Sequence, residues 1–304
     1  MSQKVLYVAG AGRSGSTIFG NVLGQLEGFA SFGELYNFPL RFLEQRYCGC
    51  GVRLPECPFW RQVVQLCWHG DVEAQLRAWL AQRDEVARAR HALRWRLSFA
   101  RQKLLLKSSA YRVTLAQFYR ALAQVSGARV LVDTSKVAGY AQVLAWTPGI
   151  ELYVVHLVRE PRAVAYSWAR TKLKPTPAGS VAIAPTSPVH GALKWLAHNL
   201  ATELYCTLPR LRYMRTRYED FVRDPCQTIR AVLDFVGERS PIPVAVDNSI
   251  ALTAQHTVDG NPDRFSKGLV VLSADDEWRH RLDWRARTLV TLIAAPLLHR
   301  YGYA

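Results

Sequence analysis

The stretch VLYVAGAGRSGST, residues 5–17, joins a short apolar run to a glycine-rich loop. A nearly all-apolar run of this length is typical of a central strand in a parallel sheet, whose two faces are both covered. After the loop, apolar residues recur at helical spacing from Ser16, and Gly28 marks the expected end of that helix. The sequence therefore predicts a strand, a glycine loop and a helix, an arrangement whose backbone N–H groups bind anions at the helix N-terminus.

The glycine loop matches two phosphate-binding patterns and completes neither. Its spacing G-x-G-x-x-G is that of a dinucleotide-binding loop, which needs an acidic residue about 20 positions later. Glu34 lies near that distance. The loop also has the G-x-x-x-x-G of nucleoside triphosphatases, but Ser16 replaces the lysine that contacts the β- and γ-phosphates there. A magnesium-dependent triphosphatase is therefore disfavoured, and Arg13 is the cation that this loop offers instead.

Three further apolar runs predict strands at 128–132, 151–158 and 211–216, and helix signals follow the last two at Pro161 and at Asp224-Pro225. Strands that alternate with helices predict an α/β fold with a central parallel sheet flanked by helices. In such a sheet, functional groups gather at the carboxyl ends of the strands. The proline-rich stretch 171–188 is expected to be a long loop near the site.

The chain of 304 residues carries 39 Lys and Arg against 24 Asp and Glu, a formal net charge of +15. Such an excess favours anionic partners. Much of it lies between Arg77 and Lys107, where we expect a solvated helix face, with docking to a partner or peripheral contact with a membrane as the alternative. No nucleic-acid partner is expected, because the stretch lacks the aromatic platforms of single-strand binders. No membrane span or leader pattern is evident, so a cytoplasmic location is expected.

Three of the six cysteines, Cys48, Cys50 and Cys57, lie close together in the sequence. They fit plain thiols, a disulfide, or a metal site in which Cys67 or His69 supplies a fourth ligand. The C-x-C spacing is tighter than the usual C-x₂-C of zinc sites, and disulfides are unusual in the cytosol. Plain thiols are therefore the favoured interpretation, and all three states stay open.

Six segments, in order along the chain, resemble the sulfotransferases that use 3′-phosphoadenosine 5′-phosphosulfate (PAPS). They are GAGRSGST (10–17), CGCGVRLPECPFW (48–60), VDTSK (132–136), VVHLVREPRAVAYSWAR (154–170), YEDFVRDP (218–225) and HTVDGNPDRFSKG (256–268). The resemblance spans nearly the whole chain. It implies one domain over residues 1–304 with a P-loop-like three-layer α/β sandwich, a helical insertion at about 40–127, and a C-terminal lid and helix at about 250–304.

The resemblance also implies two anion sites, since PAPS carries a 3′-phosphate and a 5′-phosphosulfate. Arg159 and Ser167 match the family's 3′-phosphate segment, and Tyr218 matches its residue near the adenine. The remaining expected contacts lie in the loop and the lid: Gly12, Arg13, Ser14, Gly15, Ser16, Thr17, Arg264, Lys267 and Gly268. No metal is expected at this site, because a sulfuryl group carries one negative charge fewer than a phosphoryl group.

The reaction implied is in-line transfer of the sulfuryl group of PAPS to a hydroxyl of a small-molecule, lipid or glycan acceptor. Arg13 and Lys136 are the expected cations. Glu34, in a segment that resembles the Gly-Glu element of the family's Glu-using branches, is the expected base. His256 is the main rival base, and His156 is expected to be a core residue. The alternatives are a metal-independent nucleotide kinase-like or dinucleotide-binding enzyme, and a polyanion-binding protein on the same scaffold.

Overall fold

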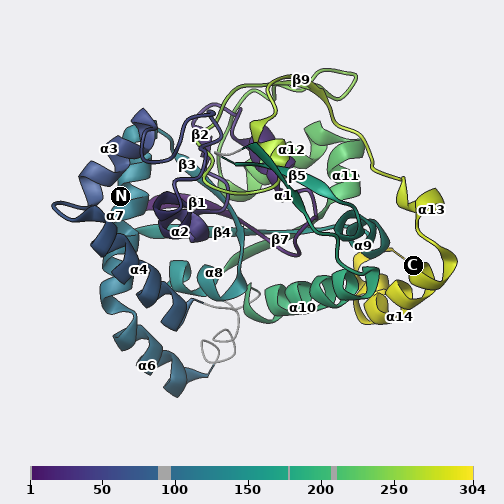
Figure 1. Cartoon of the computed structure of the whole chain (residues 1–304), viewed down its shortest axis with the longest axis horizontal. Helices are drawn as coiled ribbons and strands as arrows, with labels where there is room; N and C mark the ends of the chain where they lie inside the picture. Colours follow the sequence, from purple (N-terminus) through teal and green to yellow (C-terminus); the bar gives the residue numbers. More distant parts are fainter. Residues whose placement is uncertain (1, 88–96, 177–178, 207–210, 304) are drawn as a thin grey trace.

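In the computed structural model, which describes residues 2–87, 97–176, 179–206 and 211–303, a parallel five-stranded sheet lies at the centre (Figure 1). Its order is β2 (Phe29–Ser31), β3 (Val130–Lys136), β1 (Gln3–Ala9), β4 (Ile150–Val158) and β7 (Arg212–Arg217). All neighbouring pairs in this sheet are parallel. The predicted α/β class with a central parallel sheet is confirmed.

Side chains of β1 alternate between the two faces of the sheet, as the pleat of a strand requires. Val5 and Tyr7 pack in one core cluster, and Leu6 and Val8 pack in a second cluster on the other face. Helices therefore cover both faces, which gives the three layers that the family resemblance implied.

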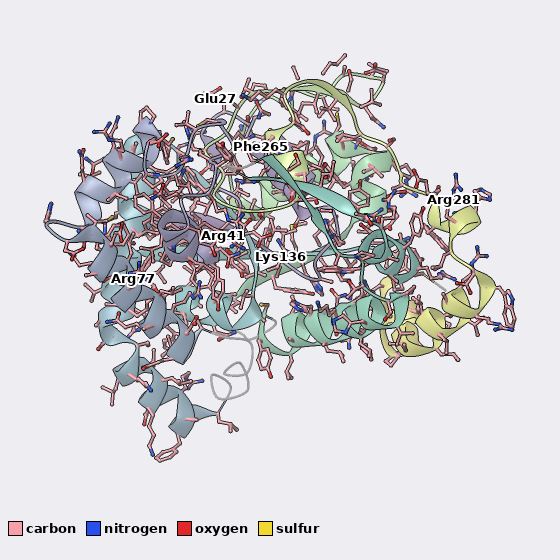
Figure 2. The ribbon with its side chains drawn as sticks, in the orientation of Figure 1. Glu27, Arg41, Arg77, Lys136, Phe265 and Arg281 are labelled. Atoms are coloured by element: carbon pink, nitrogen blue, oxygen red, sulfur yellow. The ribbon has the colours of Figure 1, made fainter. Side chains whose placement is uncertain are left out.

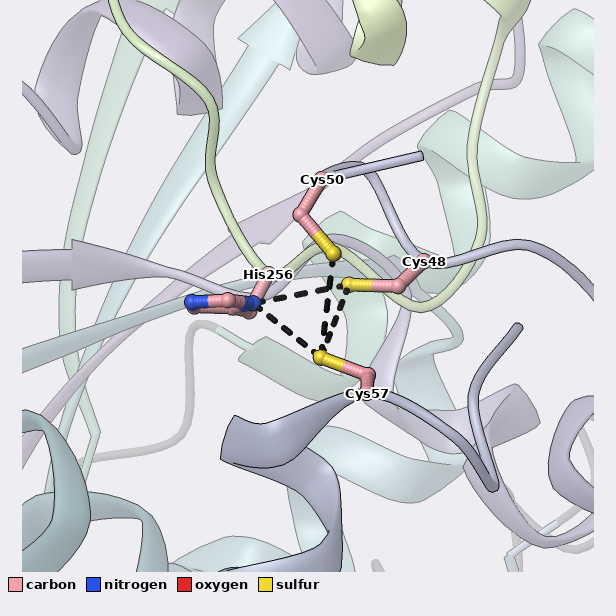
Figure 3. A group of neighbouring side chains, drawn as sticks. All are labelled: Cys48, Cys50, Cys57 and His256. Atoms are coloured by element: carbon pink, nitrogen blue, oxygen red, sulfur yellow. Dashed lines mark hydrogen bonds between the residues drawn. The ribbon is translucent and has the colours of Figure 1, made fainter. Parts of the chain in front are cut away.

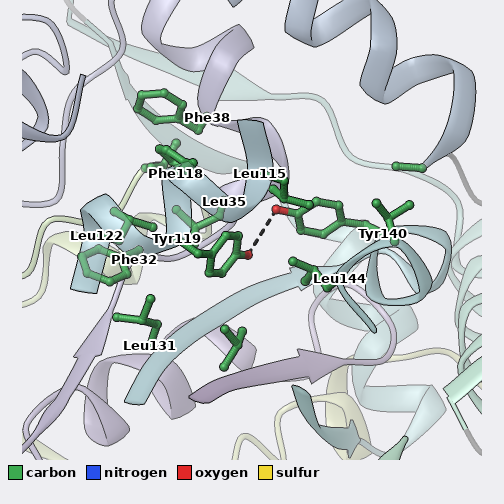
Figure 4. Close-up of a cluster of buried hydrophobic side chains, with 14 of the residues drawn as sticks. Phe32, Leu35, Phe38, Leu115, Phe118, Tyr119, Leu122, Leu131, Tyr140 and Leu144 are labelled. Atoms are coloured by element: carbon green, nitrogen blue, oxygen red, sulfur yellow. Dashed lines mark hydrogen bonds between the residues drawn. The ribbon is translucent and has the colours of Figure 1, made fainter. Parts of the chain in front are cut away.

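The helices of the first face follow β2 and β3 in the chain. They are α2 (Phe38–Leu43), α3 (Pro58–Cys67), α4 (Val72–Val86), α6 (Ser98–Lys107), α7 (Ser109–Ser126) and α8 (Ala138–Ala145). Figure 4 shows the middle of their cluster, where the Tyr119 and Tyr140 hydroxyls lie 3.1 Å apart. Tyr119 also donates a hydrogen bond of 2.5 Å to Asp133 in the middle of β3. Buried polar groups here are thus satisfied by one another.

The second face carries the helix that follows the glycine loop and a later helix pair. These are α1 (Ser16–Leu23), α11 (Tyr218–Arg223) and α12 (Pro225–Val236). A third group of helices packs beyond the end of β4: α9 (Pro161–Ala169), α10 (Pro188–Cys206), α13 (Trp278–Arg281) and α14 (Trp284–Tyr301). In Figure 1, α10 and α14 lie at the side of the molecule opposite α3 and α4.

The stretch expected to be a long loop forms a hairpin of β5 (Lys172–Thr176) and β6 (Gly179–Ile183). The loop prediction was wrong here because it took prolines as strand breakers. A two-stranded ribbon has a free edge on each strand, and a residue without an N–H such as Pro175 is tolerated there.

A second small ribbon pairs β8 (Ser249–Leu252) with β9 (Gly268–Val271), and the short helix η3 (Pro262–Phe265) lies between them. The chain between these strands crosses over the start of α1. The N–H of Val258 donates to the carbonyl of Phe32 (2.8 Å), and the N–H of Asn261 donates to Oγ1 of Thr17 (3.1 Å). These bonds bring residues 256–263 to the carboxyl edge of the sheet.

The basic stretch from Arg77 to Lys107 falls on α4, on α6 and on residues 88–96, which lie outside the described residues. Arg77 lies on α4 at the margin of the molecule (Figure 2), 3.7 Å from Glu73. Lys107 lies 3.2 Å from Glu85. These exposed pairs suit a solvated face, and membrane contact stays a prediction. None of the helices that the structure describes is long and apolar enough to cross a membrane.

Candidate active site

A cavity of about 490 Å³ lies at the carboxyl edge of the sheet, within the size range of small-molecule sites. Its walls combine the glycine loop, the ends of β3 and β4, and α9, α10 and the segment around η3. The expected site residues that line it are Gly12, Arg13, Gly15, Ser16, Thr17, Glu34, Lys136, Arg159, Ser167 and Tyr218. In Figure 2, Lys136 lies near the middle of the molecule.

The glycine loop approaches the Tyr218 ring so closely that only glycine fits at position 15. Gly15 has a φ of +84°, and a Cβ there would lie 2.3 Å from that ring. Arg13, which has a side chain, also adopts a left-handed φ of 68°. Such a conformation is costly for a non-glycine residue and is held by surrounding contacts, as is common at functional sites.

The Arg13 guanidinium is held on two sides. Its Nη1 donates to Oδ1 of Asn261 (2.6 Å), and its Cζ lies 5.0 Å from the ring centroid of Trp168. Burial lowers the pKa of Arg13 from its ordinary value, while the Asp263 and Glu34 carboxylates oppose that change. An arginine stays charged under such shifts, so the loop carries a fixed cation.

Glu34 and Lys136 form an ion pair in the wall of the cavity. Nζ of Lys136 lies 2.6 Å from Oε1 of Glu34 and donates to the carbonyl of Thr134 at 2.7 Å. Oε2 of Glu34 accepts a hydrogen bond of 3.2 Å from Asn37. The site therefore places a carboxylate and an ammonium side by side, in the same cavity wall as Arg13.

Asp133 supports this pair from the interior. It accepts hydrogen bonds from Tyr119 and Ser135, and the hydroxyl of Ser135 accepts from the N–H of Tyr36, close to Glu34 in sequence. Burial raises the pKa of Asp133 to about 6, and these hydrogen bonds oppose that rise. Asp133 is fully buried and is not among the residues that line the cavity, so it does not fit the magnesium-binding Asp of a triphosphatase.

Arg159, just after β4, lines the cavity with Ser167 of α9, and its Nη1 donates a hydrogen bond of 3.1 Å to the carbonyl of Arg13. Its Cζ lies 4.7 Å from the ring centroid of Tyr218. Its Nη2 lies 3.3 Å from Oδ2 of Asp275, and the same oxygen lies 2.9 Å from Nη2 of Arg170. The Asp275 carboxylate thus occupies a position between two guanidinium groups that would otherwise attract a phosphate.

The structure places four expected nucleotide contacts away from the cavity lining. Ser14 is buried in the loop, and Lys267 and Gly268 lie exposed at the start of β9. Arg264 is buried, and its guanidinium donates to the backbone carbonyls of Tyr47, Thr257 and Val258. The sequence motif shows a basic residue in a loop, but it does not show that backbone carbonyl oxygens bind the guanidinium. The expected role of Arg264 as a lid cation is therefore corrected to a structural one.

Two histidines considered from the sequence lie outside the cavity. The alternative base His256 is stacked on Phe59, lies 3.4 Å from Sγ of Cys57 and is not among the residues that line the cavity. His156 is fully buried between Tyr213 and Asn199, at 2.8 Å from each. Burial lowers the pKa of His156 to about 4, and it is a satisfied core residue, as expected.

The part of α10 that lines the cavity was not predicted from the sequence. Lys194, Trp195 and His198 all face it. The His198 side chain is partly exposed to solvent. Partial desolvation nevertheless lowers the pKa of its imidazole, and the charges of Lys136 and Lys194 lower that pKa further. A neutral imidazole can accept a proton, so His198 is a second candidate base. The available signal was the i, i+4 spacing of Lys194 and His198 on one helix face.

The sheet order decides against the dinucleotide-binding alternative. In that fold, the strand after the first helix pairs with the first strand and carries the acidic residue that binds a ribose. Here β3 lies between β1 and β2, so Glu34, just after β2, does not occupy that position.

A family model described as "Sulfotransferase family" matches residues 6–241. The chain belongs to the sulfotransferase family. Carbohydrate sulfotransferase 3 of Mus musculus is 27% identical over 187 residues, and that of Homo sapiens is 27% identical over 177 residues. Each match covers 54% of this chain and 36% of the relative, so this sulfotransferase matches about a third of the length of those proteins.

Two solved sulfotransferase domains share the fold of this sulfotransferase. The domain from the curacin biosynthetic pathway has 18% identity and a TM-score of 0.55, with 97% of each chain covered. The domain from the Synechococcus PCC 7002 olefin synthase has 20% identity and a TM-score of 0.50, with 96% of this chain and 95% of that chain covered.

Proposed function

We propose that this chain transfers the sulfuryl group of PAPS to a hydroxyl group by in-line displacement. The observation that carries the proposal is one cavity lined by several cationic side chains. Lys136 is paired there with Glu34, and Arg13 and Arg159 line the same cavity together with Ser167. A donor with two separate anionic groups needs more than one cation, whereas a single anion needs only one.

The residues present fit the nucleotide. Arg159 and Ser167 would hold the 3′-phosphate, and the Tyr218 ring, against which Gly15 packs, would lie near the adenine. The buried Ser14 hydroxyl has no hydrogen-bond partner among the described residues, which suits a loop built around an anion. When bound, PAPS supplies an activated sulfuryl group on its 5′-phosphate.

In the proposed reaction, Glu34 accepts the proton of the acceptor hydroxyl at a carboxylate oxygen. Arg13 and Lys136 stabilise the negative charge of the transferring group and of the leaving oxygen, in a site where fixed charges need no reorganisation. Asp133 and Ser135 position the backbone around Glu34 and Lys136 through their hydrogen bonds.

A carbohydrate hydroxyl is the acceptor class that we propose. The likeness to carbohydrate sulfotransferase 3 supports it. The cavity wall also includes the half-buried Trp168, with Nζ of Lys194 4.7 Å from its ring centroid, and an apolar face beside a cation suits a sugar ring with an acidic substituent. Small-molecule and lipid alcohols are the other outcomes of the test.

The test uses labelled PAPS, no added magnesium, and a panel of glycans, phenols and lipid alcohols. We expect label transfer to glycans in the wild-type protein and its loss in Arg13→Ala. Label on a phenol or lipid alcohol alone would overturn the glycan assignment. A wild-type protein that transfers no label and gains no thermal stability from 3′-phosphoadenosine 5′-phosphate (PAP) would contradict the proposed function itself.

A further inference from the structure

Three cysteines and one histidine meet in a cluster outside the cavity (Figure 3). Cys48, Cys50 and Cys57 come from the chain before α3, and His256 lies 208 positions after Cys48. The three Sγ atoms and one imidazole nitrogen all lie within 4.8 Å of one another. The sequence could not show this, because the fourth member comes from the segment after β8.

Four of the six distances between these atoms match those of a tetrahedral zinc site. With Zn–S of about 2.3 Å and Zn–N of about 2.0–2.1 Å, a tetrahedron separates two sulfurs by about 3.8 Å and a sulfur and a nitrogen by about 3.6 Å. The Sγ of Cys57 lies 3.7 Å from that of Cys50 and 3.9 Å from that of Cys48. Nδ1 of His256 lies 3.6 Å from Sγ of Cys48 and 3.4 Å from Sγ of Cys57.

We propose that Cys48, Cys50, Cys57 and His256 form a structural zinc site. The three cysteines bind as thiolates, and His256 binds through neutral Nδ1. Four protein ligands close the coordination shell and leave no position for a reacting group, which is typical of a structural rather than a catalytic zinc. The proposal is independent of the sulfuryl transfer proposed above.

This geometry revises the ligands considered from the sequence. Cys67 is buried within α3 and His69 lies exposed beyond it, and neither belongs to the cluster. The tight C-x-C spacing is sterically possible here because the residue between Cys48 and Cys50 is a glycine, Gly49. A Cβ on Gly49 would lie 2.2 Å from Oγ1 of Thr257 and 2.5 Å from the carbonyl of Gln255. Gly49 therefore allows the two ligand-bearing segments to touch.

Arg264 supports both ligand-bearing segments. Its guanidinium donates to the carbonyl of Tyr47, next to Cys48, and to the carbonyl of Thr257, next to His256. Three thiolates and a zinc ion carry a net charge of −1, and Arg264 places a buried positive charge close to them. Such outer groups orient metal ligands and are a regular part of metal sites.

The site joins the cysteine loop to the segment that closes the active-site cavity. Beyond His256, the carbonyl of Asp259 accepts from the N–H of Glu34 (3.2 Å), and its carboxylate lies 2.5 Å from Nε of Arg41. Asn261 then accepts from Arg13. Zinc at His256 would thus hold in place the segment that contacts the proposed base and the loop cation.

The experiment measures metal content and cobalt(II) binding in the reduced full-length protein. We expect one zinc per chain after purification and, after replacement by cobalt(II), the visible bands of a tetrahedral thiolate site. His256→Asn should weaken metal binding more than about 100-fold, since even the loss of an outer-sphere partner costs about 10–100-fold. Cys226→Ser, which alters a cysteine outside the cluster, is the matched control and should bind like wild type.

His256→Cys separates a ligand role from a role in folding. It restores a fourth ligand and should recover cobalt(II) binding with a spectrum shifted toward four sulfurs, whereas His256→Asn should not. A folded, reduced wild-type protein that gives no tetrahedral cobalt(II) spectrum would overturn the proposal. So would equal metal binding by wild type and His256→Asn. A disulfide in the freshly purified protein, seen by intact mass without reductant, would also count against it.

Discussion

At the scale of single residues, the cavity holds two ion pairs with different consequences. Glu34 and Lys136 pair where we place the chemistry, and Asp275 pairs with Arg159 where we place the 3′-phosphate. The first pair holds a base beside a cation. The second pair puts a carboxylate where a phosphate would bind, so it opposes the nucleotide. Loss of the Glu34 carboxylate should therefore lower turnover, whereas loss of the Asp275 carboxylate should tighten nucleotide binding.

Glu34→Gln should reduce turnover by about 10²–10⁴, the usual contribution of a general base, while PAP binding is retained. The amide keeps the shape of the side chain but cannot accept the acceptor's proton. Steady-state rates and calorimetric PAP affinities check the two parts. The matched variant is His198→Gln, which alters the other candidate base. Near-normal turnover in Glu34→Gln with a large loss in His198→Gln would move the role of base to His198.

Asp275→Asn should tighten PAP binding by about fivefold or more, because the substitution removes a carboxylate paired with the buried Arg159, and even an exposed ion pair is worth about 0.2–1 kcal/mol. The affinity for AMP, which lacks the 3′-phosphate, should not change. Asp276→Asn is the matched control, since Asp276 pairs with Arg279 outside the cavity. Weaker PAP binding in Asp275→Asn alone would mean that Asp275 orients Arg159 for the nucleotide instead.

At the scale of elements, the strand, loop and helix at the N-terminus were predictable because their signals are local: an apolar run, glycines and helical spacing. β2 was missed because Phe29–Ser31 is too short to give a pattern. α10 was missed as a site element because its cavity face depends on how it packs beyond β4. The zinc-like cluster needed His256 and Cys48 to meet across the fold, which no local pattern reveals.

His156 of β4, which is hydrogen-bonded to Asn199 of α10, should make the stability of the fold depend on pH. His156 has a pKa of about 4 in the folded chain, against an ordinary value of 6.5. Between those values the unfolded chain binds a proton that the folded chain does not, so the unfolding free energy falls as the pH falls from 6.5 to 4. The expected loss is about 3 kcal/mol.

His156→Gln should remove this component, and chemical unfolding at several pH values measures it. Asp133, whose pKa is raised to about 6, contributes with the opposite sign over much of the same range. The difference between the wild-type and His156→Gln unfolding free energies cancels that contribution. A difference that does not change between pH 6.5 and 4 would contradict the assignment of His156 as a buried neutral group.

At the scale of the whole molecule, the sheet order β2-β3-β1-β4-β7 brings the glycine loop, Lys136 and Arg159 to one edge. The sequence predicted this edge and the part of its lining that follows the strands, because the carboxyl ends of neighbouring parallel strands meet there. It did not predict that Asp275 or Lys194 would complete the walls, since both arrive from segments whose path depends on tertiary packing. The cytoplasmic location and the absence of a nucleic-acid partner stay predictions.

The most direct test of the account is a calorimetric comparison of PAP with AMP, without added magnesium, in wild type and in Arg159→Ala. The account predicts that wild type binds PAP about 10- to 100-fold more tightly than AMP, as charge-assisted hydrogen bonds to a 3′-phosphate allow. Arg159→Ala should remove most of that difference and leave AMP binding nearly unchanged. Equal affinity of wild type for PAP and AMP, or tight binding of ATP only with magnesium, would contradict it.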